Sequence, residues 1–412
     1  MATRCALALK DRPISQNTDI NPCLSRRIFS TEDARFLAAR RQPKVIFDFI
    51  EGAAGREVAT SRNQSRFDEI TLQPRVMENV GDRRLGKPFL GQKFDLPFGI
   101  APMGMCDLSW PGADRAIAQA ANIFNIPVCL SSAASSSIED MRDWAGENAW
   151  FQLYVGGPVE QAFEMVERAR AAGYNKLILT VDVPEVSRRV RDLRNGFAMP
   201  FRIGPKLFWD FASHPVWSLS TLWNGVPEPK NFASGKNGNR FDRSASRAGA
   251  DWEFLDRLRN RWAGKLIVKG VTSAEDALRI KLIGVDAIHV SNHGGRQLDS
   301  APAAIDLLPV IRNAVGPDYP LLFDSGVRNG EDIVKALAMG ADFVMIGRPM
   351  LYALGADGAR GLNSIIKILA QDASLTLAQT GLNDINAVSG SILYSSDPGN
   401  GNEQVPRIKS VT

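Results

Sequence analysis

The chain has 412 residues, of which 44% are hydrophobic and 23% are charged, a composition typical of a folded soluble protein. Its 49 basic and 45 acidic residues leave a net charge of only +4, which argues against nucleic acid as a partner. The four cysteines form no CxxC pair and show no ligand spacing. Neither a disulfide scaffold nor a metal site is therefore predicted.

The apolar runs are shorter than the roughly 18 to 20 residues that a helix needs to cross a bilayer. Together with the cysteine pattern, this favours a cytoplasmic protein. Residues 1–30 are expected to form a disordered tail. Residues 31–97 are expected to form an extension of helices and short strands that caps the main domain, in which Thr31 caps the first helix and Pro43 ends it.

Short apolar runs alternate with helical patterns from residue 98 to residue 380. The eight candidate strands are residues 98–101, 128–131, 150–154, 176–182, 265–270, 287–292, 320–326 and 342–347. Strands that are almost wholly apolar belong to a parallel sheet covered by helices, and eight is the number that closes a barrel. The sequence therefore predicts an α/β fold, a (β/α)8 TIM barrel, with a C-terminal tail at 381–412.

A long insertion, at about residues 190–250, interrupts this rhythm in the fourth βα loop. Residues 201–249 carry seven Lys or Arg against three Asp or Glu. The same segment holds eight aromatic residues: Phe201, Phe208, Trp209, Phe211, Trp217, Trp223, Phe232 and Phe241. A basic, aromatic segment fits the surface of an anionic membrane, but a lid or a subunit contact explains it equally well. Its end, at residues 231–250, is rich in Gly, Ser and Asn and is expected to be mobile.

Reactive groups of such a barrel lie at the carboxyl ends of the strands. The residues at these ends are Pro102, Met103, Gly104, Ser131, Gln152, Tyr154, Thr180, Asp182, Lys269, Ser291, His293, Asp324, Ser325, Gly326, Val327, Arg328, Gly347 and Arg348. The seventh and eighth strands end in "DSGVRNG" and "IGRP", glycine-bearing turns that each carry an arginine. This is where barrels commonly hold a phosphate, although ordinary tight turns would look similar.

Two of these residues, His293 and Lys269, have side chains that could take part directly in catalysis. His293, close in sequence to Arg296, could pair a base with a carboxylate anchor, and Asp182 could fix its tautomer. Lys269 could form a Schiff base, stabilise an anion, or make a structural salt bridge. The other histidines, His289 and His214, are expected to be structural.

Six motifs, "QLY", "TVD", "KG", "SNHGGRQLD", "DSGVRNG" and "GRP", occur in this order. Together they resemble the family of FMN-dependent α-hydroxy-acid oxidases and dehydrogenases, which includes glycolate oxidase, lactate dehydrogenase and mandelate dehydrogenase. The resemblance runs from about Thr31 to beyond Gln379. The stretches "SSIEDM" and "HPVWSL" look most similar to the (S)-mandelate dehydrogenase branch.

The resemblance implies that FMN fills the barrel mouth. Residues that would line the flavin are Pro102, Met103, Gly104, Ser131, Gln152, Thr180 and Ser291. Lys269 would stabilise the negative charge of the reduced flavin. The phosphate would be held by Asp324, Ser325, Gly326, Val327, Arg328, Gly347 and Arg348. His293 would act as the base with Asp182, and the substrate would be bound by Arg296, Arg189 and Tyr154.

The sequence departs from the family pattern in two places that bear on the substrate. Members usually carry "YDY" where this chain has "FDF", so Phe49 replaces a tyrosine that donates to the substrate carboxylate. Losing that donor would cost roughly 1.5 to 3 kcal/mol if nothing replaced it, which leaves open whether the substrate differs from glycolate, lactate or mandelate. Ala133 stands where glycolate oxidases carry tryptophan, which leaves room for a bulkier or aromatic substrate.

The predicted activity is the oxidation of an L-2-hydroxy acid, or a related ester, to the 2-keto product. Gly104, where oxidases often have alanine, resembles the dehydrogenase members and favours a quinone or another carrier as electron acceptor over oxygen. The alternatives are an oxidase that produces hydrogen peroxide and, less favoured, a Schiff-base lyase that uses Lys269. The family implies a homotetramer, and one of the two interpretations of the insertion is peripheral contact with the inner face of the cell membrane.

Overall fold

The structure, a computed structural model, describes residues 24–232 and 246–394. Eight parallel strands form a closed barrel in the order β10-β3-β4-β5-β6-β7-β8-β9. Their bounds are β3 Phe98–Met103, β4 Val128–Ser131, β5 Ala149–Leu153, β6 Lys176–Thr180, β7 Lys265–Val271, β8 Ala287–Val290, β9 Leu321–Phe323 and β10 Phe343–Ile346. The predicted barrel is confirmed, and each of the eight candidate runs contains one of these strands.

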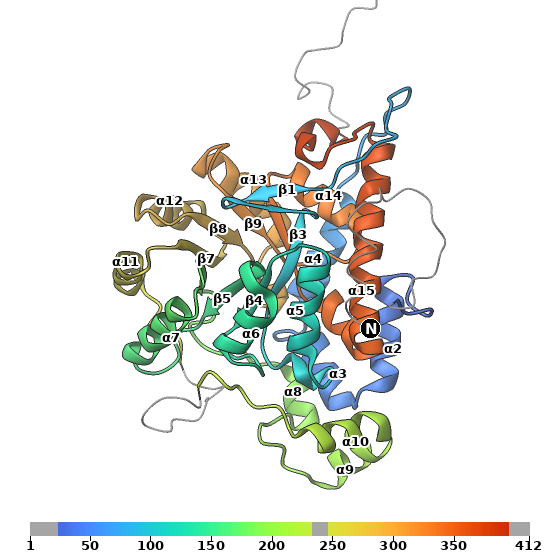
Figure 1. Cartoon of the computed structure of the whole chain (residues 1–412), viewed down its shortest axis with the longest axis vertical. Coiled ribbons are helices and arrows are strands. Elements are labelled where there is room, and N and C mark those ends of the chain that lie inside the picture. Colours follow the sequence, from blue (N-terminus) through green and yellow to red (C-terminus); the bar gives the residue numbers. More distant parts are fainter. Residues whose placement is uncertain (1–23, 233–245, 395–412) are drawn as a thin grey trace, which may run out of the picture.

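Helices surround the barrel (Figure 1). Those that follow the strands are α5 Ala113–Ile123, α6 Ile138–Ala145, α7 Val159–Ala171, α11 Trp252–Arg261, α12 Ala274–Leu282, α13 Ala304–Val315, α14 Gly330–Ala338 and α15 Arg348–Gln379. Several begin at a side chain that caps the free N–H groups of the first turn. Asn329, for example, forms a reciprocal capping box with Asp332 at the start of α14. Such caps fix where each helix leaves the strand end that precedes it.

The N-terminal extension covers both ends of the barrel. It contains α2 Thr31–Arg41, α3 Lys44–Glu51, α4 Val58–Glu69 and the antiparallel hairpin β1 Lys87–Phe89 and β2 Gln92–Phe94. The hairpin places Phe89 and Phe94 against Phe343, with ring centroids 5.3 and 5.5 Å apart. Because Trp150 is the second residue of β5 and Phe343 the first of β10, this aromatic cluster fills the amino end of the barrel.

The two predicted tails are shorter than expected. Ile28 is buried, and the Ser25 N–H donates to Ser364 Oγ at 2.8 Å. Beyond α15, Ile385 and Ile392 are also buried. Isolated apolar residues of this kind show no helix or strand period, so their packing could not be predicted from the sequence pattern. The rest of the predicted tails, at 1–23 and 395–412, lies outside the described residues.

The insertion lies at the carboxyl end of the barrel, at the bottom of Figure 1. It contains α8 Val190–Asn195, α9 Pro205–Ala212 and α10 Pro215–Asn224. Most of the segment predicted to be mobile, residues 233–245, lies outside the described residues. In the part of the chain that the structure describes, no helix is long and apolar enough to cross a membrane.

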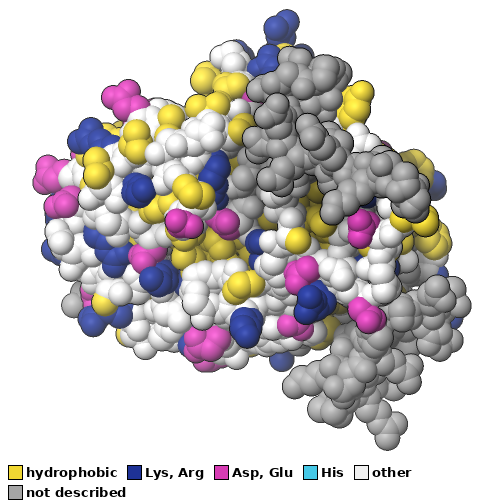
Figure 2. Space-filling model, turned by 90° about the horizontal axis from the view of Figure 1, so that it is seen from above, with side chains coloured by type: hydrophobic (Ala, Val, Ile, Leu, Met, Phe, Trp, Pro, Cys, Tyr) yellow, Lys and Arg dark blue, Asp and Glu magenta, His cyan; other side chains and the backbone are white. Residues whose placement is uncertain are grey.

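The opposite face of the molecule is seen in Figure 2. Basic and acidic side chains are intermixed across the part of it that is drawn in colour. Such a mixture of charges produces no extended field of one sign over the coloured part of this face.

Candidate active site

A single cavity at the carboxyl end of the barrel brings most of the predicted site residues together. Those that line it are Phe49, Pro102, Met103, Gly104, Ser131, Tyr154, Arg189, Lys269, His293, Arg296, Asp324, Ser325, Gly326, Val327, Arg328, Gly347 and Arg348. The other four predicted residues, Gln152, Thr180, Asp182 and Ser291, lie beside it in contact with lining residues. Strands that end on one rim of a barrel produce this convergence, although they are far apart in the sequence.

His293 is held as a neutral base. It has a left-handed backbone (φ 57°) in the turn after β8, and its Nδ1 lies 2.9 Å from Asp182 Oδ1. Burial lowers the pKa of His293 below its ordinary value, although attraction to Asp182 opposes this. With the Nδ1 proton directed at Asp182, the Nε2 atom is unprotonated, on a ring that lines the cavity. The arrangement is suited to proton abstraction.

Lys269 lies at the centre of a buried charge cluster below the cavity. Its Nζ donates to Ser291 Oγ at 2.8 Å and lies 3.1 Å from Asp324 Oδ2 and 3.9 Å from Asp182 Oδ2. His289, which is fully buried in β8, lies 3.0 Å from the same Asp324 oxygen. The prediction that His289 is a structural residue agrees with this contact.

The charge cluster also decides between the interpretations of Lys269. Burial alone would lower the pKa of Lys269, but attraction to Asp324 and Asp182 outweighs burial and raises the pKa. A lysine that forms a Schiff base needs a lowered pKa, so that the amine is neutral. The Schiff-base lyase alternative is therefore not supported, and Lys269 is a fixed positive charge.

The opposite end of the cavity is built for an anion. Arg348, the first residue of α15, is partly buried, and its guanidinium donates only to backbone carbonyls in the described part of the chain, those of Ile50, Gly52 and Gly294. Burial lowers the pKa of Arg348 to about 10. The first turn of α15 adds free N–H groups, and Arg328 lines the same end. A partly buried arginine that makes no ion pair within the described residues, at a helix N-terminus, fits a phosphate.

The strand ends also fit a flat heterocycle with hydrogen-bonding edges. Gln152 Nε2 and Thr180 Oγ1 are buried, and neither atom has a hydrogen-bond partner in the described residues. Gln152 lies near the end of β5 and Thr180 ends β6, where Thr180 is the register neighbour of Lys269 on β7. Buried polar atoms are rarely left unpaired. The two orphaned atoms and the unneutralised Arg348 are therefore consistent with a phosphate-bearing cofactor across the barrel mouth.

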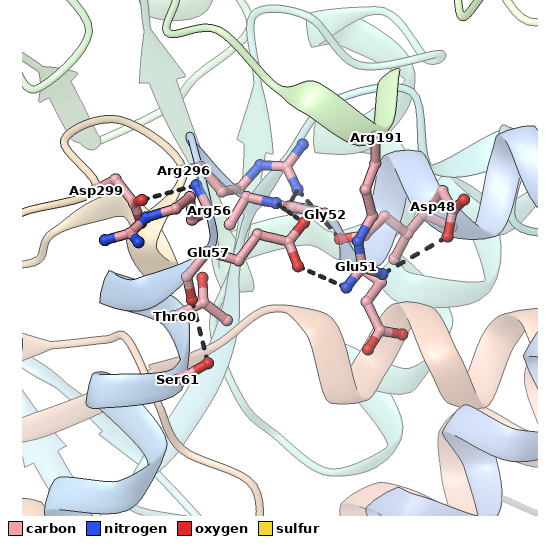
Figure 3. A network of polar contacts seen from close by, with 12 residues as sticks. Asp48, Glu51, Gly52, Arg56, Glu57, Thr60, Ser61, Arg191, Arg296 and Asp299 are labelled. Carbon is pink, nitrogen blue, oxygen red and sulfur yellow. Dashed lines mark hydrogen bonds and ion pairs between the residues drawn. The ribbon is translucent and has the colours of Figure 1, made fainter. Parts of the chain in front are cut away.

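Arg296 is anchored to the N-terminal extension. Its guanidinium donates to the carbonyls of Phe49, Ile50 and Gly52 at 3.1, 3.1 and 2.6 Å, as Figure 3 shows for Gly52. In the same view, Arg191 bridges Asp48 and Glu57. These contacts fix the end of α3 over the cavity, so part of the guanidinium is already engaged by backbone.

Phe49 stacks on Phe197 from the insertion, with ring centroids 4.4 Å apart and an interplanar angle of 8°. The Arg296 guanidinium carbon lies 5.6 Å from the Phe49 ring centroid. An aromatic wall thus stands where the family pattern places a hydroxyl donor. Ala133 lines the cavity as well, as expected for a site with room for a large substituent.

Sequence reasoning missed Arg247 as a site residue and counted it only among the basic residues of the insertion. Its side chain is buried and lines the cavity, with its guanidinium carbon 5.1 Å from the Tyr154 ring centroid. The Arg247 N–H donates to the Pro184 carbonyl at 2.8 Å. Arg247 comes from an irregular loop and not from the carboxyl end of a strand, so a search of the strand ends does not find it. Its positive charge was the only feature in the sequence that pointed to a role.

Fold and cavity together define a (β/α)8-barrel enzyme that carries a phosphate-bearing cofactor at its mouth. The family model described as FMN-dependent dehydrogenase matches residues 38–395. The chain belongs to this family and is an oxidoreductase that uses FMN. The predicted family, fold and cofactor are confirmed.

Individual relatives cover almost the whole chain. (S)-Mandelate dehydrogenase of Pseudomonas putida is 40% identical over 377 residues, which are 90% of this chain and 95% of the relative. L-Lactate dehydrogenase of Pseudomonas syringae is 36% identical over 89% of this chain and 98% of the relative. The crystal structure of a monotopic membrane protein, (S)-mandelate dehydrogenase, superimposes with a TM-score of 0.85 at 39% identity, over 90% of this chain and 100% of that one.

Proposed function

We propose that the protein oxidises an L-2-hydroxy acid with a bulky or aromatic side chain, or a related ester, to the 2-keto product. The observation that carries this proposal is the His293–Asp182 pair, in which His293 lines the same cavity as the cationic Lys269 and the anion end at Arg348. Relatives that act on mandelate and lactate support the same reaction. FMN, when bound, supplies a two-electron acceptor.

In this proposal each residue of the cavity has a separate task. His293 takes a proton from the substrate, and Asp182 stabilises the imidazolium that results. Lys269 places a positive charge at the centre of the mouth, where negative charge develops during reduction. Arg296, Arg189 and Tyr154 bind the substrate carboxylate and oxygens.

The cofactor contacts are proposed residue by residue. Pro102, Met103, Gly104, Ser131, Gln152, Thr180 and Ser291 would surround the flavin ring. Ser325, Gly326, Val327, Arg328, Gly347 and Arg348 would hold the phosphate. Asp324 would act differently, because its carboxylate faces Lys269 and His289. We therefore assign Asp324 the task of holding Lys269 in place.

A substrate panel tests the function. We expect anaerobic addition of an aromatic 2-hydroxy acid such as (S)-mandelate to bleach the yellow holoenzyme faster than glycolate does. The physical reason is the space beside Ala133 and the apolar wall of Phe49 and Phe197, which favour an apolar ring. Flavin absorbance under nitrogen is the measurement. A purified protein that fails to bind FMN, or a holoenzyme that no 2-hydroxy acid or ester bleaches, would contradict the proposal.

We also propose that α9 and α10 attach the protein peripherally to the inner face of the cell membrane. Large apolar side chains are exposed there: Ile203 (65%), Phe208 (56%), Trp209 (70%), Leu222 (75%) and Trp223 (91%). Exposed apolar patches of this kind mark interaction surfaces, and tryptophan favours the membrane interface. The mandelate dehydrogenase relative is a monotopic membrane protein. Assembly into a homotetramer remains a prediction.

The membrane proposal predicts a loss of vesicle binding on charge insertion. We expect the double variant Trp209→Glu, Trp223→Glu to bind anionic phospholipid vesicles at least about ten-fold more weakly than the wild type, because each tryptophan loses its interfacial contact. Co-sedimentation is the measurement. Met77→Glu is the control, since Met77 is 99% exposed but lies in the N-terminal extension. Equal weakening by the control, or no binding by the wild type, would refute the attachment.

A further inference from the structure

A second cavity lies beside the active site, within the insertion. It has a volume of about 1050 Å³ and is enclosed by α8, the 197–203 loop, α9, α10 and residues 226–229. Its walls are largely apolar and include Phe197, Met199, Phe201, Phe211 and Leu222. The volume is at the upper end for a small-molecule site. None of the reaction tasks described above uses this space.

The second cavity shares a wall with the active site. Met105, Val186 and Arg189 line both cavities. A molecule held in the second cavity would therefore be separated from the barrel mouth by single side chains. This closeness suits electron transfer to or from the cofactor more than storage of an unrelated ligand.

The second cavity also opens on the apolar face of α9 and α10. Ile203, Phe208, Leu219 and Leu222 line it and are themselves 65%, 56%, 67% and 75% exposed. A ligand could thus reach the active site from that face through an apolar passage. The space favours a molecule with an apolar tail over a hydrophilic carrier.

The lining of the second cavity also contains two hydrogen-bond donors that have no partner within the described residues. Thr221 is 5% exposed, and its Oγ1 has no hydrogen-bond partner in the described residues. The same is true of Arg189 Nε, which is buried in the shared wall. Both groups are donors next to an apolar space, and leaving them unpaired costs stability. These two donors could form hydrogen bonds with the carbonyl oxygens of a ligand whose ring is otherwise apolar.

We propose that the second cavity binds a para-quinone with an apolar tail, which accepts the electrons of the reaction. The inference rests on the proposed function. The hydroxy acid loses two electrons and two protons when its C–H and O–H bonds break and the keto group forms. The quinone gains two electrons and two protons to become the hydroquinone, so that the cofactor returns to its oxidised state. Thr221 and Arg189 would donate to the quinone oxygens.

The test separates the two half-reactions of the full-length holoenzyme. Its flavin is first reduced with one equivalent of dithionite, so that the result does not depend on any hydroxy acid. Re-oxidation is then followed with decylubiquinone and, separately, with ferricyanide, a small hydrophilic acceptor. We expect Leu219→Trp, which fills the passage, and Thr221→Val, which removes the donor, to slow re-oxidation by decylubiquinone at least about five-fold. Re-oxidation by ferricyanide should stay within two-fold of the wild type.

Val216→Trp is the matched control. Val216 and Leu219 lie on α10 with almost equal exposure, 65% and 67%, but only Leu219 lines the cavity. The control should therefore leave both rates unchanged. Binding is measured independently, by quenching of tryptophan fluorescence in the oxidised holoenzyme, because Trp217 lines the cavity. We expect saturable quenching by decylubiquinone that weakens in Leu219→Trp and not in Val216→Trp.

Several outcomes would overturn the quinone site. One is re-oxidation by decylubiquinone at the wild-type rate in both cavity variants, and another is equal slowing in the Val216→Trp control. A fatty acid that quenches as strongly as the quinone but does not slow re-oxidation would assign the cavity to an acyl chain. Failure of every hydroxy acid to bleach the flavin would count against the proposed function alone, since the dithionite experiment would still report on the quinone.

Discussion

Replacing His293 with asparagine is expected to lower kcat for hydroxy-acid oxidation by about 10²- to 10⁴-fold, the usual contribution of a positioned general base. The holoenzyme should remain yellow, because the proposed phosphate contacts lie at the other end of the cavity. Anaerobic bleaching measures the loss. His214→Asn is the control, since His214 lies in the insertion between α9 and α10. Turnover that survives in His293→Asn would show that another group removes the proton.

The same base predicts the pH profile. Only the neutral imidazole can accept a proton, so kcat/KM should fall as the pH falls through the pKa of His293. Burial lowers that pKa below the ordinary value of about 6.5. The acid limb of the wild-type profile is therefore expected below pH 6.5, with activity retained at neutral pH. An acid limb centred above pH 7 would contradict a neutral His293 in the resting enzyme.

Replacing Lys269 with methionine is expected to cost about 3 to 5 kcal/mol of unfolding free energy, the range for breaking a buried ion pair. The reason is that Asp324 and Asp182 would lose the ammonium that lies 3.1 and 3.9 Å from them. Flavin reduction by substrate should also slow at least ten-fold, because the positive charge at the mouth is lost. Urea unfolding of the holoenzyme and anaerobic bleaching are the measurements.

A second buried lysine offers a matched control for Lys269. Lys176 begins β6 at the amino end of the barrel, and its Nζ donates to Gln92 Oε1 and Asn175 Oδ1. Both acceptors are neutral, so Lys176→Met should be less destabilising and should leave bleaching unchanged. Lys269→Arg, which keeps the charge, should recover part of the lost rate. If Lys176→Met slowed bleaching as much as Lys269→Met, the charge at the mouth would not be the cause.

The barrel could be predicted from the sequence because each strand is a short, mainly apolar run and most strands are followed by an amphipathic helix. The rule that function lies at the carboxyl ends of the strands then collected His293, Asp182 and Lys269 without knowledge of their contacts. The local pattern of apolar and polar residues therefore predicts both the barrel and the residues at its mouth. The ends of the elements were less certain: β5 ends at Leu153, one residue before Tyr154.

What the sequence could not supply depends on contacts between distant segments. Arg247 reaches the mouth from a loop, and Arg296 is engaged by the carbonyls at the end of α3. The second cavity exists only because α8, α9 and α10 enclose it together. No residue-by-residue pattern encodes such a space, since its walls are contributed by side chains that would look ordinary on an amphipathic helix.

The β1–β2 hairpin closes the amino end of the barrel to substrate and product. Phe89 and Phe94 fill that end with side chains packed on Trp150 and Phe343. Substrate and product must therefore exchange on the side of the molecule that carries α9 and α10. If those helices rest on lipid, the hydroxy acid has to arrive sideways, through the narrow layer of water along the bilayer. Turnover on a membrane would then depend on the concentration of the anion in that layer, which the charge of the lipid head groups controls.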